Sequence, residues 1–105
     1  MRTYYAHPGQ MNALHARFRD HTNKLFVKHG MTLIGYWSPM KAEDAEQKMI
    51  YVLAYPSKAA ADKSWADFRS DPDWITARNA SETEGPLVAK VESVFLNPTD
   101  YSPIK

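Results

Sequence analysis

The sequence predicts an α+β fold in which the elements follow the order βαββαβ. Four short aliphatic or aromatic runs have strand character, two longer stretches carry helical periodicity, and turn-forming residues separate them. At 105 residues, the chain has the length of one domain, which we expect to span residues 1–105.

The N-terminal part predicts a strand followed by a helix. Arg2–Ala6 is a short aromatic strand that a Pro-Gly pair closes. The helix spans Gly9–His29, and Gly30 follows at a position that commonly adopts a left-handed conformation and ends a helix. Residues at steps of three and four form one stripe on this helix: Met11, Leu14, Phe18, Thr22 and Leu25.

The other three strands are predicted at Met31–Ser38, Met49–Tyr55 and Leu87–Leu96. A polar connection, Lys41–Lys48, precedes the second of these, and a loop, Ser81–Pro86, precedes the third.

The second helical region is predicted to contain a break. Ser57 is a candidate cap at its start, and Trp65 and Phe68 lie on one face. Asp71 followed by Pro72 is typical of a new helix start, because Asp caps well and Pro suits the first helical position.

This order is the ferredoxin-like arrangement, in which two helices cover one face of an antiparallel sheet. Met49–Tyr55 is apolar on both sides, and in Met31–Ser38 alternation places Leu33 and Trp37 on one side. Two helices cover only one face, so we expect a second copy of the sheet to cover the other in a homodimer. The alternative is that the additional aromatic residues belong to sheet edges.

Composition excludes several classes of function. The net charge is +1, with 13 basic and 12 acidic residues dispersed along the chain, so we expect no nucleic-acid partner. There is no cysteine, which excludes disulfides, thiolate nucleophiles and zinc sites built on sulfur. No apolar segment is long enough to span a membrane, so we expect no membrane association. The N-terminus lacks an apolar signal region, which favours a cytoplasmic location.

The histidines of the first helix do not predict a metal site. His15, His21 and His29 lack the i, i+4 spacing of helical metal ligands, and His15 and His29 lie about 21 Å apart along the axis. His15 flanks the apolar stripe and is a weak candidate for a general base in a cleft. The alternative is a boundary histidine with one nitrogen in water.

Arg2 and Tyr4 point to the same side of the first strand. An arginine beside an aromatic ring can hold a carboxylate or another anion through its planar fork. The alternative is an exposed strand end.

An aromatic set supplies the candidate walls of a small-molecule cleft: Tyr36, Trp37, Trp65, Phe68 and Trp74. Core packing is the alternative role for rings at helical spacing. A buried indole needs a hydrogen-bond partner, and binding clefts combine apolar walls with a few polar groups. Together with Arg2, Tyr4 and His15, these residues form the predicted ligand-binding set.

Five stretches resemble the NIPSNAP family in order and spacing: RTY, HPGQM, LFVKHGMTLIGYW, WADFRSDPDW and NPTDYSPIK. The resemblance implies a dimeric α+β barrel, in which two sheets pack face to face and each subunit has a cleft between helices and sheet. Its superfamily includes cofactor-independent monooxygenases and haem-degrading enzymes. The latter hold iron through a histidine in the second helix, and Ser57–Ala80 contains none, so we expect no cofactor.

The resemblance implies no particular reaction, and two functions stay open. The first is binding of a small apolar or aromatic molecule in the cleft between helices and sheet, either as a binding protein or as a cofactor-independent enzyme such as a monooxygenase. The second is a non-catalytic interaction or structural module that acts as a homodimer.

Overall fold

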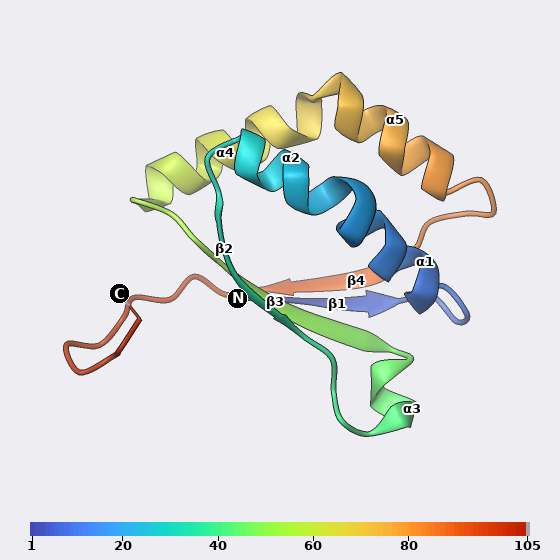
Figure 1. The fold of residues 1–105 in the computed structure, drawn as a ribbon, viewed down its shortest axis with the longest axis horizontal. Helices are drawn as coiled ribbons and strands as arrows, with labels where there is room; N and C mark the ends of the chain where they lie inside the picture. The colour runs from blue at the N-terminus through green and yellow to red at the C-terminus, as the bar shows by residue number, and fades with distance from the viewer. Residues whose placement is uncertain (105) are drawn as a thin grey trace.

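The computed structural model describes residues 1–104 as a four-stranded antiparallel sheet with helices packed on it (Figure 1). The strands lie in the order β2-β3-β1-β4, which is the ferredoxin-like order and confirms the predicted fold class. In chain order, the elements are β1 (Arg2–Ala6), α1 (Met11–Arg17), the π-helical segment η1 (Phe18–Thr22), α2 (Asn23–Lys28), β2 (Thr32–Trp37), α3 (Ala42–Ala45), β3 (Lys48–Ala54), α4 (Lys58–Ser70), α5 (Pro72–Ser81) and β4 (Val88–Ser93).

The longer helices lie on one side of the sheet. Figure 1 shows α1, α2, α4 and α5 on this side, whereas the short α3 lies in the connection between the end of β2 and the start of β3. The core lies between these helices and the sheet. Its buried residues are Met11, Leu14, Phe18, Leu25, Phe26, Met31, Met49, Tyr51, Leu53, Trp65, Phe68 and Leu87.

Strand β3 shows that only one face of the sheet is core. Met49, Tyr51 and Leu53 are buried toward the helices, whereas the alternate residues Ile50 and Val52 are half-buried on the opposite face. Both sides are apolar, as the alternation predicts. Within residues 1–104, no helix covers the side that carries Ile50 and Val52, which we name the open face.

Strand β2 departs from simple alternation. Its pairing with β3 shifts register between Leu33 and Gly35, so Leu33 and Tyr36 both pack toward the core while Trp37 pairs beside Ile50. The prediction that Leu33 and Trp37 share one side is therefore wrong, because an irregularity interrupts the two-residue period. A Cβ at Gly35 would lie 2.7 Å from the indole of Trp37, so glycine allows this ring to lie across the strand.

The first helix consists of α1, η1 and α2 in direct succession. It begins at Met11 rather than at Gly9, because the Pro8-Gly9 pair forms a turn. It ends before Gly30, whose φ of 83° confirms the predicted left-handed position. The π-helical turn at 18–22 was not predicted, and such turns occur frequently at functional sites.

The break in the second helical region is confirmed. The side chain of Ser57 accepts a hydrogen bond from the backbone N–H of Ala60 (3.1 Å), and that of Asp71 accepts one from Asp73 (2.8 Å). Asp71 is extended and Pro72 occupies the first turn of α5, so one helix ends and another begins. None of the helices in the described chain has both the length and the apolar character needed to cross a membrane.

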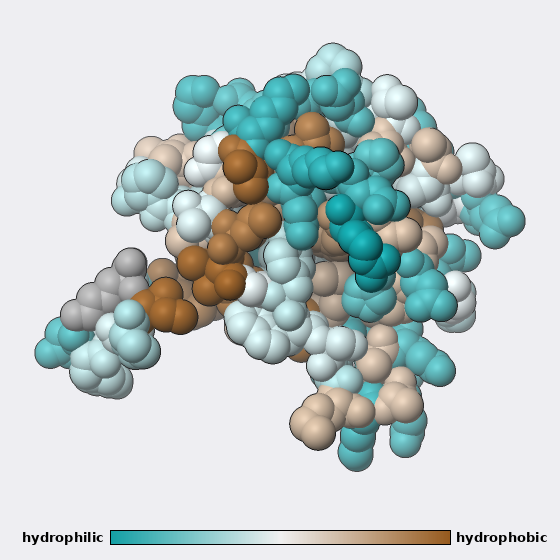
Figure 2. Space-filling view, viewed as in Figure 1, coloured by the Kyte–Doolittle hydropathy of each residue, from teal (hydrophilic) through white to brown (hydrophobic). Residues whose placement is uncertain are grey.

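Strand β4 ends at Ser93, before the predicted Leu96. Residues 94–104 then form an arm that leaves the body of the molecule (Figure 1). The arm exposes large apolar side chains at Phe95, Leu96 and Ile104. Figure 2 shows hydrophobic residues gathered on the same side of the molecule, near the start of the arm.

Candidate functional site

A cavity of about 310 Å³ lies between the first helix and the edge strand β2, and we name it the edge cavity. Residues of α1, η1 and α2 form one wall, and residues of β2 and β3 form the other. The lining residues are His15, Phe18, Arg19, Asn23, Tyr36, Trp37, Ser38 and Met49. Its size falls at the lower end of the range for small-molecule sites, and most of its walls are apolar.

Two buried polar atoms of the lining residues lack a partner. The side-chain oxygen of Asn23 and the hydroxyl of Tyr36 form no hydrogen bond within residues 1–104. Leaving such groups unpaired costs free energy, so both atoms are suited to a partner that the chain itself does not provide. Burial, with the phenols of Tyr4 and Tyr55 adding to it, raises the pKa of Tyr36 well above its usual value, so this hydroxyl stays neutral.

A second group, which we name the tyrosine–arginine cluster, consists of Arg2, Tyr4, Tyr51, Tyr55 and Trp65. The Nε of Arg2 donates to the hydroxyl of Tyr51 (2.9 Å), which in turn donates to that of Tyr4 (2.9 Å). The indole Nε1 of Trp65 donates to the hydroxyl of Tyr55 (2.8 Å). The guanidinium of Arg2 lies 4.1 Å from the centre of the Trp65 ring, so it is held by a hydrogen bond and by an aromatic face.

The edge cavity and the tyrosine–arginine cluster share a wall. The ring of Tyr36 stacks on that of Tyr51 with 5.2 Å between centres and 19° between planes. Burial, followed by the neighbouring phenol of Tyr4, raises the pKa of Tyr51 far above its usual value. Both phenols are therefore neutral hydrogen-bonding groups and are unsuited to act as bases near neutral pH.

The eight residues of the predicted ligand-binding set lie in three places. Three line the edge cavity: His15, Tyr36 and Trp37. Three belong to the tyrosine–arginine cluster: Arg2, Tyr4 and Trp65. The other two, Phe68 and Trp74, pack on each other with 4.6 Å between ring centres and line neither group.

Sequence reasoning missed seven residues of these sites as binding residues: Phe18, Arg19, Asn23, Ser38, Met49, Tyr51 and Tyr55. Tyr51 and Tyr55 belong to the predicted strand Met49–Tyr55, but nothing in the sequence indicated that their hydroxyls meet Arg2 and Trp65. Arg19 and Asn23 lie in or next to the π-helical turn and line the edge cavity. A regular helical wheel does not describe the faces on either side of such a turn, so helical periodicity could not place them.

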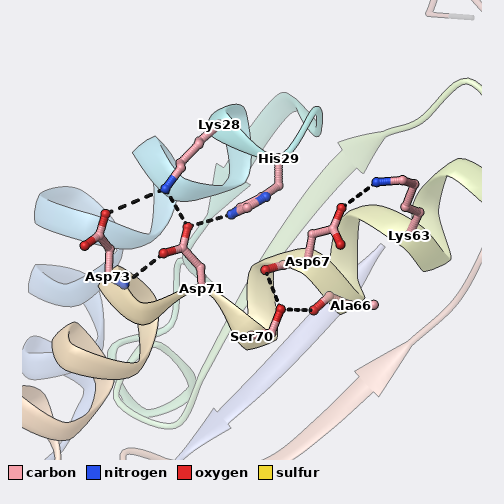
Figure 3. A network of polar contacts seen from close by, with 8 residues as sticks. All are labelled: Lys28, His29, Lys63, Ala66, Asp67, Ser70, Asp71 and Asp73. Carbon is pink, nitrogen blue, oxygen red and sulfur yellow. Dashed lines mark hydrogen bonds and ion pairs between the residues drawn. The ribbon is translucent and has the colours of Figure 1, made fainter.

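A third polar network joins the end of α2 to the start of α5 (Figure 3). The carboxylate of Asp71 lies 2.8 Å from the Nζ of Lys28 and 2.7 Å from the Nε2 of His29. His29 thus lies at the end of the helix, as predicted. The hydrogen bonds from Lys28, His29 and the backbone of Asp73 hold the pKa of Asp71 well below its usual value.

Replacing Asp71 with asparagine is expected to lower the melting temperature at neutral pH by about 5 °C, because the carboxylate caps α5 and pairs with two side chains. A carboxyl whose pKa falls on folding stabilises the protein above its unfolded pKa, and this contribution is lost progressively as the pH falls from about 4 toward the lower pKa of the folded protein. Thermal unfolding between pH 2 and pH 7 measures both effects. A difference between D71N and the original protein that persists unchanged at pH 2 would contradict this role.

No three histidine, aspartate or glutamate side chains come together as a metal-binding group in the part of the chain that the structure describes.

A four-stranded antiparallel sheet, with helices on one face and a cavity at its edge, defines a ferredoxin-like α+β protein. Comparison with protein families then identifies the group. The NIPSNAP family model matches residues 1–103, and the chain belongs to the NIPSNAP family. No curated protein matches the sequence.

Solved structures of NIPSNAP proteins share this fold. Atu4242 from Agrobacterium tumefaciens, a protein with unknown function, is 20% identical with a TM-score of 0.82, and the match covers 99% of this chain and 95% of Atu4242. An uncharacterized NIPSNAP domain protein from Burkholderia xenovorans is 20% identical with a TM-score of 0.79, covering 97% and 94%. Atu5224 from Agrobacterium tumefaciens is 21% identical with a TM-score of 0.78, covering 99% and 94%.

Proposed function

We propose that this protein binds a small apolar or aromatic molecule in the edge cavity. The observation that carries the proposal is the combination of apolar walls with two buried, unpartnered polar atoms, on Asn23 and Tyr36. A ligand with one acceptor or donor group would restore the missing hydrogen bonds, and its apolar part would lie against Phe18, Trp37 and Met49.

The residues of the edge cavity also suit a cofactor-independent enzyme. His15 lines the cavity, and histidine is the side chain best suited to accept a proton near neutral pH. The neutral hydroxyl of Tyr36 would donate to a developing oxyanion. In this form of the proposal, His15 is the general base and Tyr36 is the stabilising donor.

Closing the edge cavity tests the proposal. Ser38 is an exposed lining residue, so Ser38→Trp is expected to fill the cavity without disturbing the core, whereas Ser38→Ala leaves it open. With 2-naphthol as a neutral aromatic probe, the original protein and S38A should show saturable shifts of the Trp37 indole NMR signal. S38W should bind at least about tenfold more weakly, which corresponds to about 1.4 kcal/mol.

The same titration would overturn the proposal if all three proteins gave equal, non-saturating shifts. The far-ultraviolet circular dichroism of S38W serves as the control for folding. A folded S38W that binds the probe as well as S38A would place the binding site elsewhere.

The second candidate function is a homodimeric interaction or structural module that pairs through the open face. Ile50 and Val52 lie on this face, half-buried within one chain, and the ring of Trp37 lies across it, more than half exposed. The arm at 94–104 also carries exposed apolar side chains (Figure 2). A second copy packed face to face would cover the open face, and the twofold axis would make the contact self-complementary.

A further inference from the structure

Three positive side chains lie against the rings of Trp65 and Phe95: Arg2 from β1, and Lys58 and Arg69 from α4. The guanidinium of Arg2 lies 4.1 Å from the ring centre of Trp65, and that of Arg69 lies 5.2 Å from the same ring. Nearby, the ring of Phe95 lies 6.3 Å from that of Tyr55, and the Nζ of Lys58 lies 4.6 Å from Phe95. This region is therefore both aromatic and positively charged.

The two guanidiniums have no carboxylate to neutralise them. Within residues 1–104, the ion pairs of the chain involve other cations, and neither Arg2 nor Arg69 belongs to one. Lys58 differs, because it pairs with Asp62. Arg2 is also half-buried, so its charge is partly withdrawn from water and the groups that contact it are neutral hydroxyls.

The orientation of Arg2 leaves its outer edge available. Its Nε donates a hydrogen bond of 2.9 Å to the hydroxyl of Tyr51, and the guanidinium lies over the Trp65 ring. The two terminal nitrogens lie 3.4 Å from the hydroxyl of Ser93 and 3.5 Å from that of Tyr4, which are long contacts to neutral groups. A carboxylate binds to this terminal edge through two parallel hydrogen bonds.

Tyr4 offers a further donor. Its hydroxyl accepts hydrogen bonds from Tyr51 and Arg2, and among the described residues no acceptor takes its proton. A carboxylate oxygen at the terminal edge of Arg2 would lie next to this hydroxyl and could accept that hydrogen bond.

We propose that Arg2, Arg69 and Tyr4 form a binding site for the carboxylate of a small aromatic acid, with the ring of the acid against Phe95 and Tyr55. None of these residues lines the edge cavity, so the site is separate from the one in the proposed function. The planar fork of Arg2 favours a carboxylate over a single-point anion, and the exposed Phe95 ring provides a surface for an aromatic group.

The test compares benzoate with benzamide, which has the same shape but no charge. Calorimetry gives the affinity, and the NMR signal of the Trp65 indole N–H reports the position. Benzoate should bind saturably and shift that signal, whereas benzamide should bind at least about tenfold more weakly. R69M should weaken benzoate binding by at least about threefold. R2M should weaken it by about tenfold, because the bidentate contact is lost.

Controls make each outcome decisive. Arg78 is an exposed arginine on α5, so R78M changes the total charge equally and should leave binding unchanged. If R2M fails to fold, the exposed Arg69 provides the decisive variant. Equal binding of benzoate and benzamide, or unchanged binding in R69M and a folded R2M, would overturn the proposal. Inorganic phosphate that competes as strongly as benzoate would overturn the assignment to a carboxylate.

Discussion

Replacing Trp65 with alanine is expected to lower the free energy of unfolding by about 3–5 kcal/mol. The indole is 6% exposed and packs edge-on against the rings of Phe26 and Phe68. Its removal would leave a cavity where the indole packs on the core and would deprive Tyr55 of its hydrogen-bond donor. Urea unfolding followed by circular dichroism, at one fixed protein concentration, measures the change.

Met40 provides the matched control for this prediction. It is fully exposed, so Met40→Ala is expected to change the free energy of unfolding by less than about 0.5 kcal/mol. A loss of less than about 1 kcal/mol in W65A would mean that Trp65 contributes little to the packing of the core.

Replacing Val52 with aspartate is expected to dissociate the proposed homodimer into monomers. Val52 lies on the open face, where the second copy is proposed to pack, and a buried unpaired carboxylate would oppose that contact. We expect the dissociation constant to rise by at least about a thousandfold, which corresponds to about 4 kcal/mol. Analytical ultracentrifugation over a range of protein concentrations measures it directly.

Ile75→Asp is the control for Val52→Asp. Ile75 lies on α5, in the helical layer, and is 40% exposed, so the same type of substitution there should leave the dimer intact. If the original protein sediments as a monomer, or V52D associates as tightly as the original, the open face is not an interface between copies.

Regular patterns in the sequence predicted the fold well. The element order, the cap at Ser57, the break at Asp71 and the turn at Gly30 all follow from local chemistry that acts over a few residues. Prediction failed in β2, where the register shift places Leu33 and Trp37 on opposite sides. The shift depends on the pairing with β3, which is a long-range contact that local alternation does not contain.

The candidate site was predicted only in part, because its parts come from distant segments. Alternation correctly placed Arg2 and Tyr4 on one side of β1, but their partner Tyr51 lies 49 residues from Arg2 along the chain. The π-helical turn similarly determines which residues of the first helix reach the edge cavity. Trp74 shows the reverse case, since it joined the core against Phe68 rather than a cleft.

Native mass spectrometry of the protein, purified gently from its own cells, tests most directly whether the edge cavity holds a small molecule. We predict a bound mass of a few hundred daltons per chain in the original protein and in S38A, and no such mass in S38W, where the cavity is filled. An original protein that carries no ligand, even when purified gently, would contradict the proposal. The same bound mass in a folded S38W would show that the molecule binds outside the edge cavity.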